Sequence, residues 1–541
     1  MPFQNKPLQF TSITSPGFFG LNTQDSGVDM GVQFATTAYN AIIDKSGRIS
    51  ARKGWLYTTT SGGTSSTPEA MIEFDNHNGT YTIISAGNNK LFTGETTMTE
   101  MSVRNATDTG NATYTITGNN WQFAPAQFSS GTAASAHMVA AQSGHPALMY
   151  HKRPSGGGGG GSHAHTGNFG FQRLGDVGNV PTGFTVTTFT PSCALGAFGR
   201  MWTANTGSND KLTVYYSVLL DPSDFTGSGS GVLNLEKVVP GDDRIVALAS
   251  HNDFLIIFCE KNIVIYNNAA NIANIALQDI IVGIGCVARD SVQNIGTDIL
   301  FLSDSGVRSL SRTIQEKSAP VRDISRNVRD QLISYIAGED LTKIRSVYSK
   351  TDAFYLLIMP TSKYTYCFDV RQFLQDGSAR ATLWNNIDPK CAAYTHNNRL
   401  LFGKADGVAQ YTGYSDNSIG YTFSYFTPYL DFGSPSITKI LKKIGITVVG
   451  GSSTTFDLKW GFDYQTNYKT LQFTTAAANV AEYGSAKYNI SEYSATIFID
   501  NIKKQLSGGG NVIQIGVDAL INGKPVSIQK LDIYAVTGRT I

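Results

Sequence analysis

Residues 248–267, which read LASHNDFLIIFCEKNIVIYN, constrain the fold more than any other stretch of the chain. Three short apolar runs are separated by two tight polar turns, 250–253 and 260–262. The central run, 254–258, has the length of a strand and is bounded by turn residues, which indicates a mostly buried strand. The stretch therefore predicts a small antiparallel sheet.

The same order of elements occurs at two other places, near residues 74–94 and 394–413. Each copy has a His-Asn pair in its first turn, and Asn both tolerates left-handed turn geometry and bonds the turn backbone. We therefore expect the histidines of these turns, His251 among them, to be structural. Further strand pairs bring the total to about six or seven small sheets. Radial repetition of such sheets in a β-propeller is the usual way to protect so many short strand edges, so a β-propeller is expected.

The chain divides into three parts by pattern. Residues 1–60 read as an extended N-terminal arm with a hairpin, and residues 61–414 as an irregular β-propeller of about six or seven blades. A glycine-rich insertion near 154–170 reads as an exposed loop between blades, because ordering a glycine run costs much entropy. Residues 415–541 carry longer alternating strands, which predict a β-sandwich-like domain. The expected fold class is all-β, with one helix over 321–336 that ends at Gly338.

Composition excludes several classes of function. The 541 residues carry a net charge of +1, so a dedicated nucleic-acid coat is not expected. Only 15% of the residues are charged, which is less than in average soluble domains. This low fraction suggests that part of the protein surface is buried in interfaces with other subunits or proteins. The five cysteines are widely spaced, with no zinc motif, and predict buried free thiols in a protein made in a reducing cytoplasm. No signal peptide and no apolar run of membrane-spanning length are found, so no membrane insertion is expected.

Enzyme motifs are weak. Asp242-Asp243 resembles a carboxylate pair for glycoside hydrolysis, but adjacent residues point apart, so two solvated turn carboxylates are expected. Residues 303–306 partly match the Asp-box turn of sialidase propellers without its Thr-Trp ending, and read as a hairpin turn. No HExxH, GxSxG, P-loop or kinase set occurs. The sequence therefore predicts no catalytic residue, no cofactor and no enzyme.

Two stretches leave alternatives open. His163 and His165 form a His-x-His pair that copies around an oligomer axis could use to share a metal, but no Cys, Asp or Glu is near, and an exposed polar loop is the simpler interpretation. Phe18 and Phe19, bracketed by glycine, fit either an arm that docks on a partner or an anchor in the core of the same subunit. The candidate interaction residues of this stretch are Phe18, Phe19, Leu21 and Asn22.

Several phrases, spread over both ends and the middle of the chain, resemble one family. They are residues 16–22, 40–49, 52–54, 285–292, 300–310 and 525–539. Together these phrases resemble the tail nozzle proteins of short-tailed bacteriophages (podoviruses), also called stabilisation or head-completion proteins. The glycine-rich loop with its two histidines has no counterpart in that resemblance.

The resemblance implies a non-enzymatic structural protein of the virion. Such nozzles assemble as a homohexamer below the portal and its adaptor ring, extend the DNA ejection channel, help to retain packaged DNA and offer attachment surface for tail fibres or spikes. It also implies assembly in the host cytoplasm and contact with double-stranded DNA without sequence specificity. Scattered basic residues, Lys442, Lys443 and Lys503 among them, fit either phosphate contacts or solvated faces.

Two rival functions remain open from the residues alone. The tyrosine-rich strands, with 25 Tyr in the chain, also fit a receptor- or glycan-binding propeller of the virion, an adhesin. A glycan hydrolase would need carboxylates clustered at the central channel, which the sequence does not locate.

Overall fold

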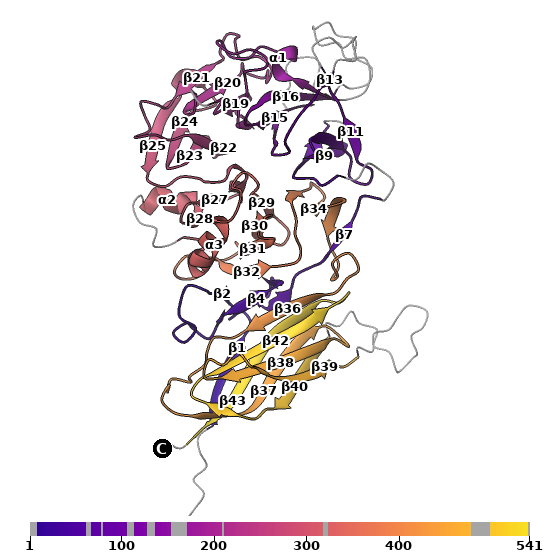
Figure 1. Cartoon of the computed structure of the whole chain (residues 1–541). Helices are drawn as coiled ribbons and strands as arrows, with labels where there is room; N and C mark the ends of the chain where they lie inside the picture. The colour runs from indigo at the N-terminus through magenta and orange to yellow at the C-terminus, as the bar shows by residue number, and fades with distance from the viewer. Residues whose placement is uncertain are drawn as a thin grey trace, which may run out of the picture.

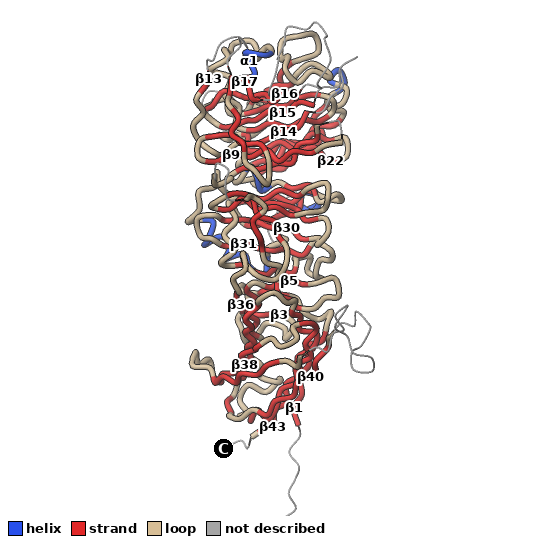
Figure 2. Tube along the Cα trace, turned by 90° about the vertical axis from the view of Figure 1, so that its right-hand side faces the viewer, coloured by secondary structure: helices blue, strands red, loops and turns tan. Residues whose placement is uncertain are grey.

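The chain forms two β-rich parts that lie end to end, a propeller and a sandwich (Figure 1). Figure 2 shows the same two parts after a quarter turn, with the propeller above and the sandwich below. The computed structural model describes residues 8–60, 66–76, 79–104, 113–126, 136–152, 170–207, 210–316, 323–477 and 498–538.

Six small sheets are arranged as the blades of a β-propeller. The first contains β8 (Ala70–Asp75), β9 (Tyr81–Gly87), β10 (Lys90–Thr93) and β11 (Thr99–Met101). The second contains β12 (Val103–Arg104), β13 (Thr113–Tyr114), β14 (Gln122–Ala126), β15 (Ala136–Gln142), β16 (His145–Lys152) and β17 (Gly170–Arg173). The third contains β18 (Cys193–Ala197), β19 (Arg200–Ala204), β20 (Thr213–Tyr216) and β21 (Gly231–Asn234).

The strands of the other three small sheets follow one another along the chain, except that the sixth sheet takes one strand from the N-terminal segment. The fourth contains β22 (Ile245–His251), β23 (Phe254–Cys259), β24 (Asn262–Asn267) and β25 (Ala276–Val282). The fifth contains β26 (Gln293–Asn294), β27 (Ile299–Ser303) and β28 (Gly306–Ser309). The sixth contains β33 (Cys391–Tyr394), β34 (Leu400–Lys404), β35 (Gly407–Tyr411) and, from the N-terminal segment, β7 (Trp55–Tyr57).

One further segment closes the ring. It contains β29 (Arg345–Ser349), β30 (Phe354–Met359), β31 (Tyr364–Asp369) and β32 (Arg380–Trp384), which belong to an eleven-stranded sheet. β29 contacts β26 on one side and β33 on the other, and β33 contacts β8. The expected propeller is therefore confirmed, and its ring is completed by part of a larger sheet.

The sandwich consists of two layers. One is a seven-stranded sheet of β1 (Leu8–Thr14), β5 (Ala41–Ile43), β6 (Ile49–Ala51), β37 (Lys439–Gly450), β40 (Ile499–Gln505), β41 (Gly509–Gly510) and β43 (Val526–Thr537). The other is the rest of the eleven-stranded sheet: β2 (Gly20–Leu21), β3 (Phe34–Ala35), β4 (Thr37–Tyr39), β36 (Tyr421–Phe426), β38 (Thr455–Phe462), β39 (Lys469–Thr474) and β42 (Ile513–Ile521). Most of the sandwich strands after residue 415 lie where the alternating pattern predicts them, but β1–β6 come from the N-terminal segment and were not expected in this domain.

The two parts share both a sheet and a core. β32 of the propeller pairs in parallel with β4, and β4 pairs with β36 of the sandwich. A single buried cluster runs from Ile444 and Leu531 in the sandwich to Leu357 in the propeller. The propeller and the sandwich are therefore joined by hydrogen bonds and by apolar packing rather than by a linker.

The N-terminal segment is not an arm separate from the two domains, which corrects the expected division at residue 60. β1 pairs with β43 along seven residues, β5 and β6 extend the same sheet, and β7 completes a propeller sheet. Alternating apolar residues such as Ile13, which is buried, place this segment in the core. Its backbone hydrogen bonds go to strands at the other end of the sequence, a pairing that local pattern does not show.

The described helices are short: α1 (Leu174–Val177), α2 (Leu310–Glu316), α3 (Arg329–Ile336) and the single-turn helices η1 (Ile272–Asn274), η2 (Arg289–Ser291) and η4 (Arg326–Val328). The helix expected over 321–336 is therefore shorter than predicted. Ile324 is buried, but its N–H donates to Val307 O of β28 (3.0 Å), so it extends a strand edge instead of beginning the helix. Gly338 does not take a left-handed conformation. No helix in these described ranges is long and apolar enough to cross a bilayer.

The predicted turns are confirmed where they are described. β22, β23 and β24 form the antiparallel sheet expected from residues 248–267. Asn252 and Asn398 have φ values of 47° and 59°, the left-handed conformation expected for Asn in these turns. All five cysteines are buried free thiols, as predicted. The glycine run 156–161 lies outside the described residues.

Candidate functional site at the centre of the propeller

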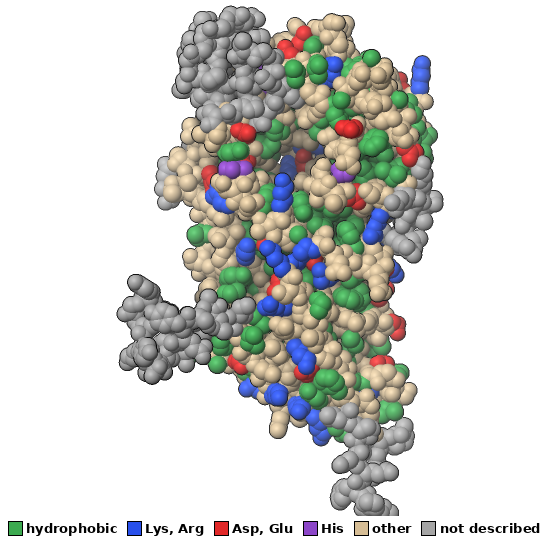
Figure 3. All heavy atoms as spheres, turned by 180° about the vertical axis from the view of Figure 1, so that it is seen from behind, with side chains coloured by type: hydrophobic (Ala, Val, Ile, Leu, Met, Phe, Trp, Pro, Cys, Tyr) green, Lys and Arg blue, Asp and Glu red, His purple; other side chains and the backbone are tan. Residues whose placement is uncertain are grey.

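One edge strand from each propeller sheet lies next to the axis. β14 contacts β8 and β18, β18 contacts β22, and β29 contacts β33. Between β22, β27 and β29 lies the short helix η2, which contacts all three strands. Figure 3 shows the molecule hollowed at the centre of the propeller, with charged side chains inside the hollow. η2 therefore brings polar side chains to the place where the sheets converge.

Four side chains form a central polar cluster: Asn120, Arg289, Asp290 and Arg345. The Asp290 carboxylate oxygen Oδ2 accepts hydrogen bonds from Arg289 Nη2 and from Arg345 Nη1, both at 2.8 Å. Asn120 Oδ1 accepts from the same two guanidinium groups, at 3.0 and 2.6 Å. One carboxylate therefore bridges two arginines that come from different parts of the ring.

The cluster also bonds the backbone of other sheets. Arg289 Nη1 donates to Ser192 O, just before β18 (2.7 Å), and Arg345 Nε donates to Glu69 O, just before β8 (3.0 Å). Ser346 Oγ in β29 donates to Asp290 O (2.8 Å). These bonds connect η2 with segments that enter four different sheets, since Asn120 precedes β14. The cluster is thus placed to hold the sheets together at the axis.

Burial and charge act in opposite directions on this cluster. Burial raises the pKa of the Asp290 carboxyl, but the guanidinium groups of Arg289 and Arg345 outweigh that effect and hold the pKa below its ordinary value. Burial lowers the pKa of the Arg345 guanidinium, while Asp290 opposes the change. Asp290 is therefore ionised at neutral pH, and its lone pairs face two cations rather than a substrate.

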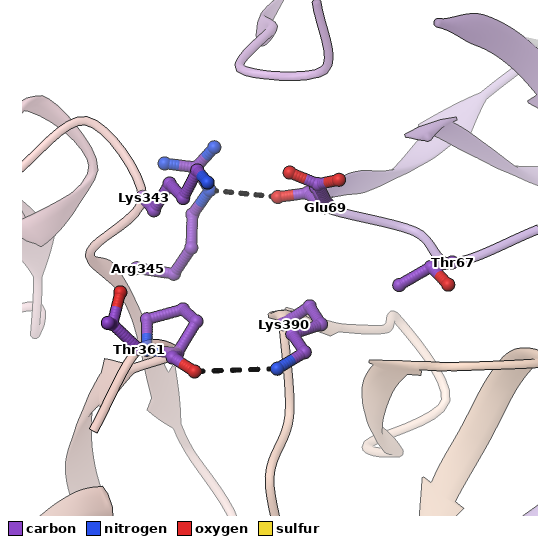
Figure 4. A pocket seen from close by; sticks show the side chains of 7 residues that line it. Thr67, Glu69, Lys343, Arg345, Thr361 and Lys390 are labelled. Atoms are coloured by element: carbon purple, nitrogen blue, oxygen red, sulfur yellow. Dashed lines mark hydrogen bonds between the residues drawn. The ribbon is translucent and has the colours of Figure 1, made fainter. Parts of the chain in front are cut away.

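A pocket of about 270 Å³ lies beside the cluster (Figure 4). Its walls come from loops that enter β8, β29 and β33 and from the turn after β30. The residues that line it are Thr67, Glu69, Lys343, Arg345, Pro360, Thr361 and Lys390. The pocket thus has three cationic side chains and one carboxylate, together with two hydroxyl groups.

The side chains that line the pocket differ in how many hydrogen bonds they already make to the rest of the protein. The Lys343 side chain is exposed and donates no hydrogen bond within the described part of the chain. Lys390 Nζ bonds Asp388 Oδ1 at 2.7 Å and Pro360 O at 3.4 Å. Glu69 Oε1 accepts from Asn119 Nδ2 (2.8 Å), and Oε2 accepts no hydrogen bond within the described residues. The pocket therefore offers an ammonium group and a carboxylate oxygen to a ligand.

The arrangement is unlike a pair of hydrolytic carboxylates. Glu69 is the single carboxylate among the residues that line the pocket, and Asp290 is neutralised by two arginines. Asp242 is exposed, as expected, but Asp243 is buried and accepts from Asn262 Nδ2 at 2.7 Å. The expectation of two solvated turn carboxylates is therefore wrong for Asp243, which stabilises the turn between β23 and β24.

The predicted interaction residues of the N-terminal segment lie mostly inside the molecule. Phe18 and Leu21 belong to the large shared core, and the Phe18 ring meets Tyr425 edge-on with centroids 5.7 Å apart. Asn22 is buried and accepts from the backbone N–H groups of Gln24 and Asp25 at 3.0 and 3.1 Å. Phe19 is only partly buried, against Phe34. Three of the four side chains are therefore unavailable to a partner, which favours the core-anchor interpretation.

The two histidines weighed as metal ligands, His163 and His165, lie outside the described residues. Within the described ranges, no group of three or more His, Cys, Asp and Glu side chains is arranged to hold a metal ion. The central polar cluster was not predicted from the sequence because its three segments, at Asn120, Arg289-Asp290 and Arg345, are 55 to 225 positions apart. The Arg289-Asp290 pair inside an apolar stretch was the one available signal.

Two groups of exposed apolar side chains lie on opposite flanks of the molecule. β21 and β25 run along one side of the propeller and β7 along the other (Figure 1). The first flank patch consists of Val232, Leu277 and Val282, and the second of Leu56, Ile419 and Leu520. All six side chains are between 44% and 70% exposed. Ile419 is next to β7, because the adjacent turn bonds Asn417 N to Trp55 O (2.7 Å).

Lysines gather on the sandwich. Lys442 and Lys443 of β37 and Lys503 of β40 are exposed. Figure 3, the view from behind, shows Lys and Arg side chains over the lower half of the molecule, where the sandwich lies. Lys443 also stacks on the Tyr534 ring at 4.4 Å. Lys439 differs, because it is buried and bonds Asn511 O (2.7 Å). The exposed lysines give this end of the molecule positive charge.

The chain matches no protein-family model, and no curated protein matches it in sequence. Among solved structures it is similar to PorZ, a surface component of the type-IX secretion system of Porphyromonas gingivalis, with 11% identity and a TM-score of 0.34 over 65% of this chain and 37% of that chain. It is also similar to a glycoside hydrolase family 43 arabinoxylan arabinofuranohydrolase from Bacillus subtilis, with 10% identity and a TM-score of 0.27 over 90% and 98% of the two chains. The chain therefore spans well under half of the length of PorZ, and likeness at this level carries no argument about activity.

Proposed function

We propose that the chain is a structural protein of a short-tailed phage virion, a tail nozzle that assembles as a homohexamer below the portal and its adaptor ring. The observation that carries the proposal is the pair of flank patches on a chain with only 15% charged residues. Isolated exposed apolar side chains need no explanation, but groups of them mark contact surfaces. The family resemblance of the sequence supplies the kind of assembly.

The positions of the two flank patches favour a ring. A contact that joins different surfaces of identical subunits continues from copy to copy, and it closes into a ring when the rotation between copies allows. The first flank patch lies on the outermost strands β21 and β25, whose outer edges have no described partner. The second patch lies across the molecule, beside β7. Each copy therefore offers one patch to each of two neighbours.

The internal construction suits a wall that bears load during DNA ejection. β1, β5, β6 and β7 fix the N-terminal segment to both parts, and a continuous sheet joins the propeller to the sandwich. A protein built in this way moves as one body rather than as hinged domains. In the proposed ring, the exposed lysines of the sandwich contact DNA phosphates without reading sequence.

The proposed nozzle has several partners. They are other copies of the chain, the adaptor ring above, tail fibres or spikes around, and double-stranded DNA inside. The protein is made and assembled in the host cytoplasm and remains in the tail of the virion. The proposed role is structural and needs no cofactor.

Subunit mixing tests the proposal. Val282→Lys should block the first flank patch and Ile419→Lys the second, so each variant alone should stay monomeric. The wild type, mixed with its adaptor, should form six-fold rings that negative-stain microscopy detects. A mixture of the two variants should give dimers and nothing larger, because each keeps one intact patch. Light scattering after size-exclusion chromatography measures these states.

Tyr464→Lys is the matched control, since Tyr464 is an equally exposed large side chain away from both patches. The control should assemble like the wild type. Wild-type protein that stays monomeric with its adaptor, or flank variants that still form rings, would reject the proposal.

A further inference from the structure

We propose that the pocket beside the central polar cluster binds a small sugar acid, a ligand that carries one carboxylate and several hydroxyl groups. The inference rests on the side chains of the pocket and does not depend on the ring proposed above. At about 270 Å³ the pocket lies just below the usual range of ligand pockets, roughly 300–1,000 Å³, and so suits a single monosaccharide unit.

One wall of the pocket suits the acid group. Lys343 and Arg345 approach from one side and Lys390 from below in Figure 4. The Lys343 ammonium is exposed and unbonded within the described residues, and Lys390 Nζ bonds two oxygens, which leaves a third N–H. Hydrogen bonds from cations to a carboxylate are the strong ones in proteins. An anionic group is therefore preferred over a neutral one at this wall.

The opposite wall suits hydroxyl groups. Glu69 faces the cations across the pocket in Figure 4, and its Oε2 is free to accept a hydrogen bond. Thr67 Oγ1 donates to Ala405 O (2.7 Å) and keeps its lone pairs for a ligand hydroxyl. A simple anion such as phosphate at neutral pH would meet the repulsion of Glu69 here. A ligand with hydroxyl groups on this side and its acid group on the other satisfies both walls.

The pocket is already in position before a ligand arrives. Arg345 Nε holds the Glu69 backbone carbonyl, so the two walls are tied to each other. The turn that carries Thr361 is fixed because Glu339 accepts from the N–H groups of Thr361 and Ser362, at 3.1 and 2.6 Å. A fixed pocket loses little entropy when it binds. Such a site can hold a small ligand that makes only a few contacts.

Titration of the full chain with sodium D-glucuronate tests the inference, with binding followed by isothermal calorimetry or by ligand-detected NMR. Glucuronate should bind saturably and roughly tenfold or more tightly than glucose, which lacks the charge, and than acetate, which lacks the hydroxyl groups. Inorganic phosphate is the third comparison ligand. No saturable binding of glucuronate, or equal binding of phosphate, would overturn the proposal.

Variants locate the site. Lys343→Ala combined with Lys390→Ala should weaken glucuronate binding about tenfold or more and leave the weak glucose binding unchanged. Glu69→Gln should weaken glucuronate binding while acetate binding stays the same or improves, because a repulsive charge is removed. Lys350→Ala is the matched control, an exposed lysine at the other end of the strand that begins with Arg345. If Lys350→Ala lost as much glucuronate binding as the double variant, this location of the site would be rejected. Thermal unfolding of each variant checks that it is folded.

Discussion

The interior of the sandwich and the centre of the propeller are held together by opposite means. Ile13, Phe18, Ile444 and Leu531 are among the many fully buried apolar side chains that fill the sandwich and continue into β29–β32. At the propeller axis, charged and amide side chains bond the segments that enter the sheets. The stability of the apolar core depends on how well side-chain volume fills the space, whereas the stability of the central polar cluster depends on every hydrogen-bond and ion-pair partner being present.

This difference follows from geometry. Two sheets that face each other can interdigitate apolar side chains over a whole layer, as in any sandwich. Sheets that radiate from an axis each turn one edge strand toward it, and backbone carbonyls just before these strands, such as Ser192 O and Glu69 O, lie outside the ladder. Buried carbonyls need donors. Arginine, with five N–H groups, supplies several at once.

The largest effect is expected from Asp290→Asn, which changes the shape of the side chain little and removes one charge. The buried guanidinium of Arg345 and the mostly buried one of Arg289 would lose their shared carboxylate, and breaking a buried pair in this way costs about 3–5 kcal/mol. The free energy of unfolding, measured by urea denaturation at pH 7, should fall by that amount. Hydrogen exchange should rise first in the propeller strands next to η2.

A matched charge removal on the propeller surface provides the control. Glu260 bonds Arg244 Nε at 3.0 Å, but both side chains are largely exposed. Exposed pairs contribute about 0–1 kcal/mol, so Glu260→Gln should change stability little. Similar losses in Asp290→Asn and Glu260→Gln would show that the central polar cluster is not special.

The second effect concerns a buried lysine in the propeller sheet that β7 of the N-terminal segment completes. Lys404 of β34 is 6% exposed, its ammonium bonds Ile387 O, and it lies 4.1 Å from the centre of the Trp55 ring. Burial lowers the pKa of Lys404 to about 8 from its usual 10.5. Between those two values the unfolded chain binds more protons than the folded protein, so this side chain makes stability rise with pH through that window.

The expected gain is about 3 kcal/mol between pH 8 and pH 10.5, and it should be absent in Lys404→Met. The buried cysteines titrate in the opposite sense, because burial raises the pKa of each thiol, to about 12 for Cys391 and about 11 for Cys286. The measured quantity is therefore the difference in unfolding free energy between wild type and variant at each pH. A difference that stays constant from pH 8 to 10.5 would contradict the lowered pKa.

The periodicity of the sequence predicts what depends on neighbours along the chain. The turn at Asn252, the sheet over 248–267 and the long strands after residue 415 all follow from local pattern, and the structure has them. The expectation of a separate arm over residues 1–60 is wrong because β1 and β7 pair with strands hundreds of positions away. Alternation identifies a strand, but it does not identify the partner of that strand.

The candidate site was harder to predict for the same reason. Glu69, Lys343 and Lys390 look like ordinary polar residues in loops, and only ring closure brings them to one pocket. Phe18 and Leu21 show the reverse problem, since glycine-bracketed aromatic residues are compatible with both a docking arm and a core anchor. Burial decides between the two, and burial depends on the fold of the whole chain.

The smallest effect is expected in the sandwich, where Ile13→Val removes one methyl group from a fully apolar site. Ile13 is buried opposite Leu531 of β43. Loss of a single buried methyl group costs about 0.5–1.5 kcal/mol, since neighbouring side chains partly close the space. Urea denaturation should show this small loss, and hydrogen exchange should rise in β1 and β43 rather than at the propeller axis. Thr14→Ala, at an exposed position of the same strand, is the control and should stay within about 0.5 kcal/mol of wild type. A loss of stability for Ile13→Val as large as that for Asp290→Asn would mean that the sandwich core tolerates small changes no better than the propeller centre. The proposed difference between a core held by apolar packing and a centre held by specific hydrogen bonds and ion pairs would then be wrong.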